Sequence, residues 1–396
     1  MPLEFTMMAR GGPSMTDVQA MLDQFEKETR IHVRLTILPW ETAWIDIVKM
    51  ALYGSGPDIS EVGTTWLSNL VATGALHPFQ PGEVNSFGGP GAFLPAIWST
   101  CTVVGNPEVW AIPWLADTRL IYYRRDWLEG AGIEEATAFQ THEDLKRTLA
   151  RLQAGGVTAP WGVPTRFTHI TLHAVASWIW GAGGDFISED GTRVLFDQPE
   201  ARTGIRAYYD LHQWLAPAAR HQESGLADSL FTTGQAAATI SGSWTFLLYR
   251  RTTPDQVASW GMAIPPGIPF VGGSNLAIWR HSRRPSDALK LIHFLTRRSV
   301  QIKYNPLIGL LPVRVDAMTD PAITDDPAIQ IMVRAMQAGR SFPTMRRWGL
   351  VEDRLGVALT QLWADVLAAP KLDLDALMHQ NLDLLAERLN ITLRQE

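Results

Sequence analysis

Apolar and polar positions alternate with two different periods along the first third of the chain. In residues 31–38 isoleucine, valine and leucine occupy every second position, with histidine, arginine and threonine between them, which predicts a strand with one buried face. Leu3–Met8 and Ile59–Val62 are short apolar runs, the second opened by Gly-Pro and closed by a glycine, and they predict two further strands. The first third is therefore expected to contain three strands.

In the segments that follow these strands, apolar residues recur at intervals of three or four. This spacing predicts helices that begin with Ser14 as the capping residue, cover residues 41–53 and run over Trp66–Thr73, where Gly74 supplies the left-handed residue that ends a helix. Three successive strand–helix units predict a parallel sheet with right-handed crossovers. Ligands bind at the carboxyl ends of such strands, so the three loops are expected to form one binding rim.

The remainder of the chain continues the alternation of strands and helices. Further strands are expected at Val109–Pro113, Arg119–Tyr123 and Ala237–Ile240. Residues 114–118 are expected to connect the first two, and Thr141 and Ser286 to cap helices. In the last third leucine and methionine recur at helical spacing, which predicts helices there. The predicted fold class is α/β.

Composition narrows the class of protein. A chain of 396 residues is long for one hydrophobic core, so two domains are expected. The net charge is −6 and no run of lysine and arginine exceeds two residues, which argues against a nucleic acid or an anionic membrane held by bulk charge. Apolar stretches such as Ala174–Trp180 are too short to span a bilayer. The single cysteine, Cys101, excludes an intramolecular disulfide.

Six sequence features occur in the order of one known family. They are FEKETRIHVRLTILPW, GSGPDI with the later ATGALHPF, VWAIPWLADTRLIYYRRDWLEGAGI, FTTGQAAATISGSW, GGSNLAIW and NPLIGLLPVR. With these features the chain resembles the extracellular solute-binding proteins of carbohydrate-uptake ABC transporters, of the maltodextrin-binding type. The resemblance extends over nearly the whole chain.

The resemblance implies a two-lobe periplasmic-binding-protein type II fold, in which each lobe is a mostly parallel sheet flanked by helices and the ligand cleft lies between the lobes. The N-terminal lobe would comprise residues 1–114 and 268–305, and the C-terminal lobe residues 118–264 and 310–396. The chain would cross between lobes in loops near 114–118, 265–270 and 305–310, and closure on the ligand would be a hinge motion.

A location outside the cytoplasm rests on the resemblance alone. The family implies a periplasmic or extracellular protein that is tethered to the membrane in its native form. This sequence shows neither a leader nor a lipobox cysteine: Met1-Pro2 is followed directly by the first strand. The residues by themselves leave two possibilities open, a cytosolic protein or one whose export signal is absent from this sequence.

Sugar binding requires aromatic platforms for the apolar face of a pyranose and bidentate polar groups for its hydroxyls. The chain has sixteen tryptophans, several of them beside glycine, proline or threonine. Trp244 is the strongest candidate platform, since it follows Gly-Ser after a predicted strand. Trp348 resembles an aromatic of the family's late helix. Trp40 and Trp66 follow strand ends, although Trp66 is as well explained by packing at the start of its helix.

Polar candidates accompany these aromatics. Asp117 lies in the first crossing, where the family places a carboxylate for sugar hydroxyls; its alternative role is to fix the loop. Arg119, Arg166 and Asp185 are candidates in the second lobe. Small polar groups at the rim of the first lobe complete the ligand-binding set: Thr64, Thr65, Ser274 and Asn275. Asp58 is expected to fix the loop after Pro57, and three tryptophans in apolar helical patterns are expected in the core: Trp178, Trp180 and Trp363.

Motifs for other chemistry are weak. His169 and His173 have the spacing of a helical metal pair, but no glutamate of a zinc peptidase accompanies them, so two ordinary histidines are expected. The sequence has neither a G-x-x-x-x-G-K phosphate loop nor a G-x-S-x-G nucleophile turn. A glycoside-active enzyme on the same fold stays a competing class, because its paired carboxylates would be close only in space.

The sequence therefore predicts a non-enzymatic receptor, without cofactor or metal, that captures a neutral mono- or oligosaccharide and delivers it to a membrane permease. The expected partners are the carbohydrate and the permease subunits of an ABC transporter, with no nucleic acid, and the expected state is a monomer. The alternative ligand is a polyol or a phosphorylated polyol, because several arginines lie near the predicted cleft.

Overall fold

The computed structural model describes residues 1–9, 14–166, 168–215, 224–368 and 373–394. The chain forms two compact units, each assembled from three segments. The first unit consists of Met1–Thr118, Ser243–Thr252 and Val271–Gly349, and the second of Arg119–Gly242, Thr253–Phe270 and Leu350–Glu396.

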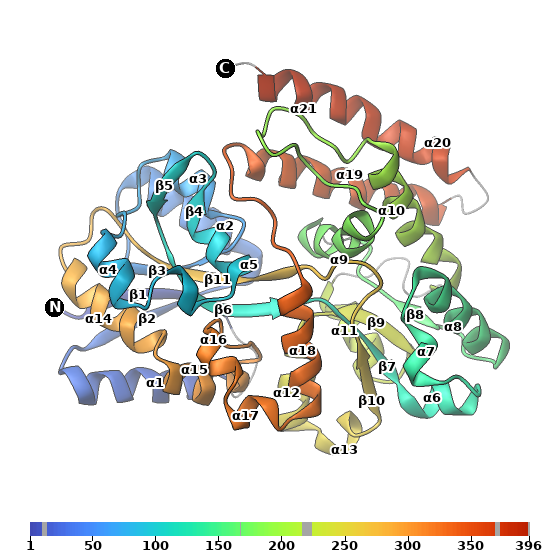
Figure 1. Cartoon of the computed structure of the whole chain (residues 1–396), viewed down its shortest axis with the longest axis horizontal. Coiled ribbons are helices and arrows are strands. Elements are labelled where there is room, and N and C mark those ends of the chain that lie inside the picture. The colour runs from blue at the N-terminus through green and yellow to red at the C-terminus, as the bar shows by residue number, and fades with distance from the viewer. Residues whose placement is uncertain (10–13, 167, 216–223, 369–372, 395–396) are drawn as a thin grey trace. The chain divides into compact units, whose positions relative to one another are not determined.

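The first unit is built on a five-stranded sheet with the strand order β2-β1-β3-β11-β6 (Figure 1). Its strands are β1 (Leu3–Met8), β2 (Val33–Leu38), β3 (Ile59–Gly63), β6 (Ile112–Thr118) and β11 (Val271–Ile278). β1 pairs in parallel with β2 and β3, whereas β11 is antiparallel to both β3 and β6. The three N-terminal strands and their parallel pairing confirm the prediction.

Burial explains why these segments form strands. β3 is buried along its whole length and β1 at all but one residue, as expected of central strands covered on both faces. β2 is an edge strand in which exposed and more buried residues alternate, and this alternation is the pattern visible in its sequence. A short hairpin, β4 (Thr102–Val103) and β5 (Asn106–Val109), completes the strands of this unit.

Helices cover the sheet of the first unit. The longer ones are α1 (Ser14–Thr29), α2 (Trp40–Tyr53), α12 (Trp244–Thr252), α14 (Pro285–Leu295), α15 (Arg298–Tyr304) and α18 (Pro327–Ala338). The shorter ones are α3 (Leu67–Ala72), α4 (Pro81–Ser86), α5 (Pro95–Trp98), α16 (Val315–Met318) and α17 (Pro321–Thr324), with 3-10 turns η1 (Pro90–Ala92), η2 (Ser99–Cys101) and η5 (Pro306–Ile308).

Two predicted helix caps are wrong. Ser14 is the first residue of α1, and its hydroxyl donates to the carbonyl oxygen of Leu307 (3.1 Å). At α14 the residue before the helix is Arg284, with Pro285 in the first turn, so Ser286 lies inside the helix. Proline is favoured at this position because its missing N–H would have no partner within the helix anyway.

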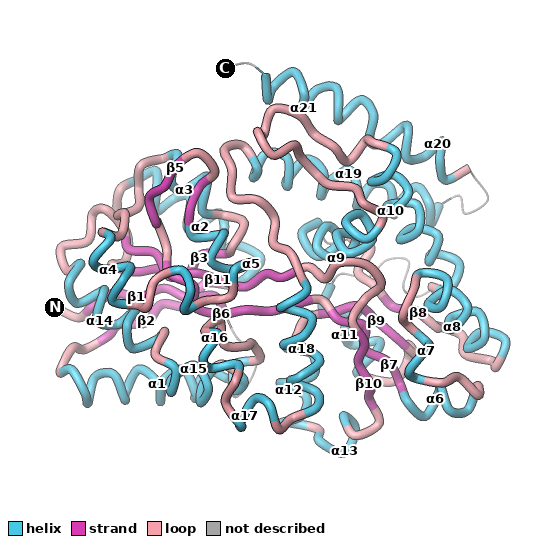
Figure 2. The backbone as a smooth tube through the Cα atoms, viewed as in Figure 1, coloured by secondary structure: helices cyan, strands magenta, loops and turns pink. Residues whose placement is uncertain are grey.

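The second unit contains a four-stranded sheet in the order β10-β7-β9-β8 (Figure 2). Its strands are β7 (Leu120–Arg124), β8 (Trp161–Gly162), β9 (Ala238–Ser241) and β10 (Trp260–Ala263). Its helices are α6 (Arg125–Gly130), α7 (Glu135–Ala138), α8 (His142–Ala154), α9 (Thr168–Gly181), α10 (Pro199–Tyr209), α11 (Ser224–Thr232), α13 (Pro254–Val257), α20 (Leu374–Met378) and α21 (Leu384–Arg394), with η3 (Asp210–Trp214) and the π-helical turn η6 (His379–Asp383). Helix α19 (Trp348–Ala368) begins in the first unit and continues in the second.

Two predictions for the second unit are confirmed, a helix cap and a group of buried tryptophans. Thr141 caps α8 in a capping box: its hydroxyl accepts the backbone N–H of Asp144 (3.1 Å), whose carboxylate accepts the N–H of Thr141 (3.1 Å). Trp178, Trp180 and Trp363 are buried, as their apolar helical surroundings predicted.

The segment predicted as the first crossing loop is a strand. β6 continues from Ile112 to Thr118 and every residue in it is buried, so neither the expected strand over 109–113 nor a loop over 114–118 is present. The pairing with β11 explains the extended conformation, because Val271 lies opposite Thr118 and Gly272 opposite Asp117. The crossing loop at this place was what the family resemblance implied.

The units also differ from the expected lobes. The chain changes unit at 118–119, 242–243, 252–253, 270–271 and 349–350. The expected third crossing at 305–310 lies inside the first unit, as does much of the segment assigned to the C-terminal lobe. Backbone bonds hold that segment: Leu311 N–H donates to Ala116 O (2.9 Å), and Val271 N–H donates to Arg340 O (2.8 Å).

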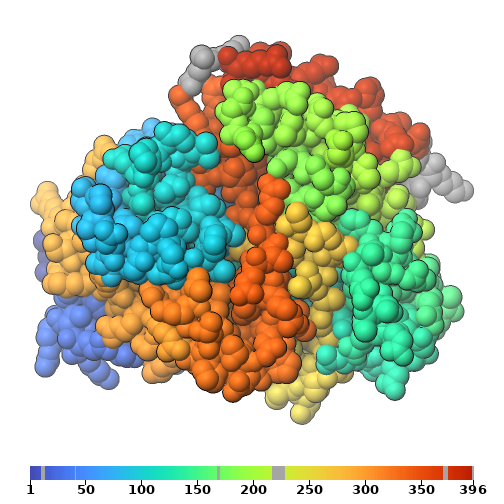
Figure 3. Space-filling model, in the orientation of Figure 1, coloured from blue at the N-terminus to red at the C-terminus, as the bar shows by residue number. Residues whose placement is uncertain are grey.

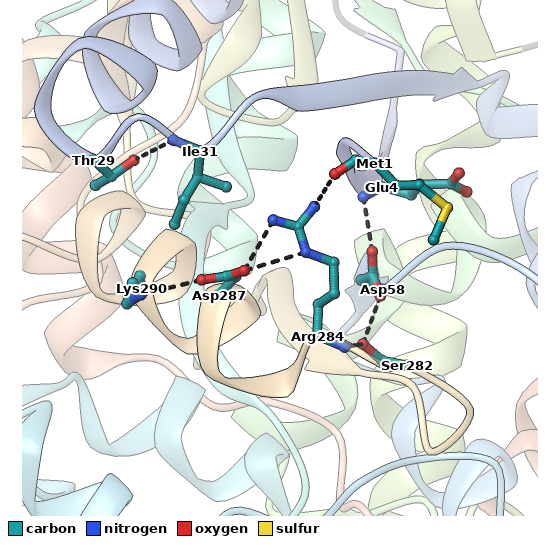
Figure 4. Close-up of polar contacts among 9 residues, drawn as sticks. All are labelled: Met1, Glu4, Thr29, Ile31, Asp58, Ser282, Arg284, Asp287 and Lys290. Carbon is teal, nitrogen blue, oxygen red and sulfur yellow. Dashed lines mark hydrogen bonds and ion pairs between the residues drawn. The ribbon is translucent and has the colours of Figure 1, made fainter.

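A polar cluster around Asp58 lies at the amino ends of the parallel strands (Figure 4). Its carboxylate accepts the backbone N–H of Glu4 (2.9 Å) and the hydroxyl of Ser282 (2.6 Å), so it fixes the loop before β3 as predicted. Nearby, Arg284 donates to the carboxylate of Asp287 (2.9 Å).

The N-terminal segment of the first unit is also tied to the segment near residue 300. Figure 3 shows orange atoms of the latter beside blue atoms of the former. Between these segments Arg297 Nη1 donates to Glu28 Oε2 (3.0 Å). These contacts lie at the periphery of the sheet, and its carboxyl edge carries the candidate site.

Candidate functional site

The carboxyl edge of the first sheet brings together five chain segments. β1, β2 and β3 are parallel and end at this edge, as does β6, which is parallel to them because both it and β3 are antiparallel to β11. β11 starts at the same edge, with Ser274 opposite Gly63. The residues that directly follow Leu38 and Gly63 therefore lie on one rim with Ala9, which follows Met8. The sequence predicted a rim of three loops, and in the first of them Gly11 and Gly12 lie outside the described residues.

A buried carboxylate, that of Glu61, connects the strands that end at this rim. Glu61, on β3, is fully buried; one of its oxygens accepts the backbone N–H of Met8 (2.8 Å) and the other accepts the hydroxyl of Ser274 (2.5 Å). It thereby ties together the ends of β1 and β3 and the beginning of β11. Sequence analysis missed Glu61, although a glutamate inside an apolar strand is an unusual residue and was a usable signal.

Ser274 and Asn275 are engaged in the framework of the first unit. Ser274 is buried with its hydroxyl on Glu61. Asn275 is completely buried, and its amide donates to the hydroxyl (2.9 Å) and to the carbonyl oxygen (3.3 Å) of Thr100. These bonds explain why a serine and an asparagine occur at these two positions. We therefore leave both residues out of the proposed ligand set.

Trp40 is the most exposed aromatic at the rim. It begins α2 directly after Pro39, and 48% of its surface is accessible. Its Nε1–H donates to the carbonyl oxygen of Ala9 (3.0 Å), the first residue beyond β1. The indole is therefore held in place while much of its surface is open to solvent, as a stacking platform requires.

Trp66 stands where β3 ends. Its backbone N–H donates to Gly63 O (3.0 Å), which makes a tight turn, and its half-buried indole packs beside Trp44, with ring centroids 5.5 Å apart and planes inclined by 45°. Thr65 is half-buried, whereas Thr64 is buried and its N–H donates to Gly273 O (3.3 Å). Trp44 was not predicted, although it follows Trp40 by four residues on the same helix.

Trp244 begins α12 and belongs to the first unit, whereas its expected position was in the C-terminal lobe. The indole is half-buried. The preceding Ser243 is buried and its hydroxyl donates to Gly309 O (3.1 Å), which fixes the start of the helix. Gly309 has a φ of 82°, and a β-carbon there would lie 3.2 Å from Cβ of Trp244, so a glycine permits this close approach.

Trp348 is a core residue. Its side chain is completely buried against Phe342, with ring centroids 4.9 Å apart. The helix start is packed so closely that a β-carbon on the neighbouring Gly349 would lie 2.1 Å from Nδ2 of Asn69. A ring without accessible surface offers no face for stacking, so we leave Trp348 out of the proposed ligand set.

Asp117 is the acidic residue of the rim. It is buried near the end of β6, opposite Gly272 of β11. The register partner Gly272 has no side chain. Asp117 stays a predicted ligand residue on the strength of this position.

In the second unit Arg119 and His173 form a hydrogen-bonded pair. Arg119 is buried, its Nη2 lies 3.1 Å from Nδ1 of His173, and its guanidinium lies over the ring of Phe270 (5.6 Å). Because a guanidinium can only donate, Nδ1 of His173 accepts, and the neutral ring carries its proton on Nε2. Nε2 lies 4.0 Å from Oε1 of Glu352. His173 thus lies between a buried guanidinium and a buried carboxylate.

The remaining polar candidates differ in their surroundings. Arg166 is exposed. Asp185 has a structural role, because its carboxylate accepts the backbone N–H of Phe186 (2.9 Å) and the indole N–H of Trp180 (3.2 Å). The side chain of His169 lies outside the described residues, so the predicted His169–His173 spacing has no structural counterpart to compare.

Among the described residues, no group of three or more histidine, cysteine, aspartate and glutamate side chains is placed to hold a metal ion. Within the same residues, none of the helices combines the length and the apolar character that crossing a membrane requires.

Two α/β units joined by several chain crossings, with ligand loops at the carboxyl edge of a mixed sheet, define a two-lobe binding protein of the type II class. Residues 12–302 match the family model of the bacterial extracellular solute-binding proteins. The chain belongs to this family, which is a family of binding proteins and not of enzymes.

Individual relatives agree with this assignment. The chain is 22% identical to the maltotriose-binding protein of Pyrococcus abyssi over 325 residues, which cover 79% of this chain and 67% of the relative. It is similar to the crystal structure of an ABC transporter solute-binding protein from Thermotoga lettingae bound with α-D-tagatose, with a TM-score of 0.85, 22% identity and 99% coverage of both chains. The sugar-binding protein MalE of Xanthomonas citri gives a TM-score of 0.82 with 23% identity over the full length of both chains. These structural likenesses show the fold.

Proposed function

We propose that the protein captures a neutral saccharide outside the cytoplasm, in a membrane-tethered form, and delivers it unchanged to the permease of an ABC importer. The observation that carries the proposal is the exposed Trp40 indole, held by its bond to Ala9 at the rim where three parallel strands end. An exposed aromatic face at this rim suits a ligand that itself has an apolar face, as a pyranose has. The sugars named for the relatives support the same ligand class.

We assign a smaller set of residues to the ligand than the sequence suggested. In the first unit we propose Trp40, Trp66 and Trp244 as aromatic contacts, with Thr64, Thr65 and Asp117 for hydroxyl groups. In the second unit we propose Arg119 and Arg166. The first of these arginines is buried and bonded to His173, and the second is exposed.

A thermal-shift screen tests the proposal. A ligand that binds only the folded protein stabilises it by RT ln(1 + [L]/Kd), about 4 kcal/mol at a thousandfold excess over Kd. We expect a neutral saccharide to raise the melting temperature in a panel of sugars, polyols, glycerol 3-phosphate and amino acids. A response to the phosphorylated polyol alone would replace the saccharide by the alternative ligand. A response to amino acids alone would contradict a carbohydrate ligand.

Whether the bound saccharide is recovered unchanged distinguishes a receptor from an enzyme. After incubation with excess protein the saccharide should be recovered intact, and mass spectrometry of both the free and the bound fraction shows whether it is. Release of a shorter sugar would identify a glycoside-active enzyme and would contradict the receptor.

A further inference from the structure

His173, on α9, restrains the guanidinium of Arg119. The Nη2 atom of Arg119 lies 3.1 Å from Nδ1 of His173, and because a guanidinium can only donate, Nδ1 accepts. An imidazole nitrogen accepts a hydrogen bond only while it carries no proton, so this bond requires the neutral ring. The position of the buried Arg119 side chain therefore depends on the protonation of its neighbour.

Phe270 supports both members of this pair. The imidazole of His173 is stacked on the Phe270 ring, with centroids 4.2 Å apart and planes inclined by 13°. The Arg119 guanidinium lies over the same ring, 5.6 Å from its centroid. Arg119 and Phe270 also stand at two places where the chain changes unit, 118–119 and 270–271. The pair thus joins the beginning of one segment of the second unit to the end of another.

Glu352, on α19, lies on the other side of the imidazole. Its Oε1 is 4.0 Å from Nε2 of His173, which is too long for a hydrogen bond but close enough for an ion pair once the ring is charged. The Glu352 side chain is only 5% accessible, so its charge is screened little by solvent. A proton added to His173 would therefore be attracted by Glu352 and repelled by Arg119.

The ring can take up this proton in the folded protein. The His173 side chain is 18% accessible, so it exchanges protons with solvent without unfolding. Histidine ordinarily changes its charge between roughly pH 5 and pH 8. In the charged ring both nitrogens are donors, so Nδ1 and the guanidinium would face each other as two donors and their bond would be lost.

We propose that His173 is a positioning residue of the ligand site: the neutral ring holds Arg119 in place for the saccharide, and protonation of the ring releases Arg119 and weakens saccharide binding in mild acid. The proposal rests on the proposed function, since it takes a saccharide as the ligand and Arg119 as one of its contacts, and it adds control by pH. By linkage, a proton that weakens saccharide binding is itself bound less tightly by the complex than by the free protein.

The pH dependence of saccharide affinity tests this inference. The probes are glucose, maltose, maltotriose and D-tagatose, and the one that binds the unmodified protein most tightly is used for titration calorimetry on the whole chain. Titrations between about pH 7.5 and pH 5.5 cover the range in which histidine ordinarily gains its proton. We expect the affinity of the unmodified protein to fall by about threefold to tenfold over this range, the scale of one hydrogen bond to a charged group.

His173→Asn is the decisive variant. The side-chain oxygen of asparagine can take the place of Nδ1 and accept the bond from Arg119, whereas the amide takes up no proton in this range. The variant should therefore bind the probe with the same affinity at both ends of the range. His173→Phe keeps a ring stacked on Phe270 but accepts no bond, so it should bind at every pH about as weakly as the unmodified protein binds in acid.

His281→Asn is the matched control. Like His173, His281 is half-buried and stacked on an aromatic ring, that of Trp279, with centroids 5.8 Å apart. Its Nε2 lies 3.1 Å from the carbonyl oxygen of Pro57, which precedes the amino end of β3, so this histidine lies at the sheet edge opposite the rim. Its substitution should leave the pH dependence of saccharide affinity unchanged.

Glu352→Gln tests the same inference if His173→Asn does not fold. Without the carboxylate the ring takes up its proton less readily, so the fall in affinity should move to lower pH. A fall at the same pH as in the unmodified protein would contradict the role of this carboxylate and with it the inference.

The remaining outcomes are equally definite. If the unmodified protein and His173→Asn lose affinity to the same extent, or if folded His173→Phe binds as tightly as the unmodified protein at neutral pH, the inference is overturned and the saccharide receptor stands. If none of the four probes binds at any pH, the proposed function itself is contradicted, and the inference falls with it.

Discussion

The indole of Trp66 lies directly on the backbone of Gly63. A β-carbon built on Gly63 would lie 3.0 Å from Cε2 and 3.1 Å from Cδ2 of the ring, closer than carbon atoms normally approach one another. The missing side chain at residue 63 therefore sets how near the indole comes to the end of β3. The position of the Trp66 indole therefore depends on one glycine at the end of the strand.

Gly63→Ala should weaken saccharide binding by about three- to tenfold, because the indole must move by a few tenths of an ångström to admit the methyl group. The melting temperature without ligand should change little, since Gly63 ends a strand and the indole beside it is only half-buried. Titration with the saccharide that gives the largest thermal shift measures the effect.

Gly82→Ala is the control for this substitution. A β-carbon at Gly82 would have no atom within 4 Å, so it adds the same methyl group without displacing a neighbour. If Gly63→Ala binds as tightly as Gly82→Ala, the position of the Trp66 ring is unimportant for the ligand.

Elements with a strong local pattern could be predicted from the sequence. The alternation in β2 and the glycine-bounded run of β3 reflect burial by neighbouring strands, and the capping box of Thr141 is a purely local interaction. β6 could not be predicted in the same way. Its extended conformation comes from pairing with β11, which is far away in sequence.

The candidate site was predictable in position but not residue by residue. Parallel strands place their carboxyl ends together, and this fixed the rim that Trp40 and Trp66 share. Whether a polar side chain at the rim faces a ligand or the framework depends on its partners. Ser274 points to a buried glutamate of another strand and Asn275 to Thr100, and no spacing along the chain encodes either contact. The complete burial of Trp348 likewise follows from Phe342 and the surrounding tertiary packing.

Trp363→Ala should destabilise the protein without a specific effect on binding. The ring is completely buried and lies against Tyr209 (4.5 Å between centroids) and Tyr208 (5.6 Å). Removing it leaves a large cavity in the second unit and should lower the free energy of unfolding by about 3–5 kcal/mol. Chemical denaturation measures this loss, and binding per folded molecule should persist.

Trp244→Ala should have the reverse effect. The half-buried ring leaves a smaller cavity, so melting without ligand should be nearly unchanged, whereas saccharide affinity should fall by at least about 2 kcal/mol, the scale of a binding hot spot. Titration and ligand-free melting of both variants separate the two roles. A Trp244→Ala protein that is unstable but binds normally when folded would remove Trp244 from the proposed ligand set.

Closure of the two units on the ligand stays a prediction from the family resemblance. A ligand can favour a closed state only if it binds that state more tightly than the open one. Small-angle scattering with and without saturating saccharide should show a smaller radius of gyration in the bound form. An unchanged radius, with binding confirmed by titration on the same sample, would contradict closure.

We expect protonation of His142 to make the protein less stable in mild acid than at neutral pH. Its ring is stacked on Trp178, 5.6 Å between centroids, and burial lowers the pKa of His142, opposed by a hydrogen bond with the backbone of Pro266. The other nitrogen, Nε2, is buried and has no hydrogen-bond partner among the described residues. Protonation would therefore place a charge beside a buried nitrogen that has no hydrogen-bond partner in the described part of the chain, and Glu143 offsets this cost only in part.

The direction of the pH effect follows from this shift. With a folded-state pKa below the ordinary value, the unfolded chain binds more protons than the folded protein once the pH falls below about 6.5. The stability contributed by neutral His142 is complete above that pH and is lost progressively as the pH falls toward the folded-state pKa. Carboxylates such as Asp190, whose hydrogen bonds to Ser188 and Thr192 lower its pKa to about 2, lose their contribution only at lower pH.

His142→Phe isolates this contribution, because the phenyl ring keeps the stacking on Trp178 and cannot be protonated. We expect the free energy of unfolding of the unmodified protein to fall between about pH 7 and pH 5, and that of the variant to fall less. His293, whose pKa is lowered by burial and by Arg297, is present in both proteins and cancels in the comparison. Urea denaturation at each pH gives the two curves. Parallel curves would show that His142 takes up its proton equally in the folded and unfolded states, in contradiction to the burial of its ring.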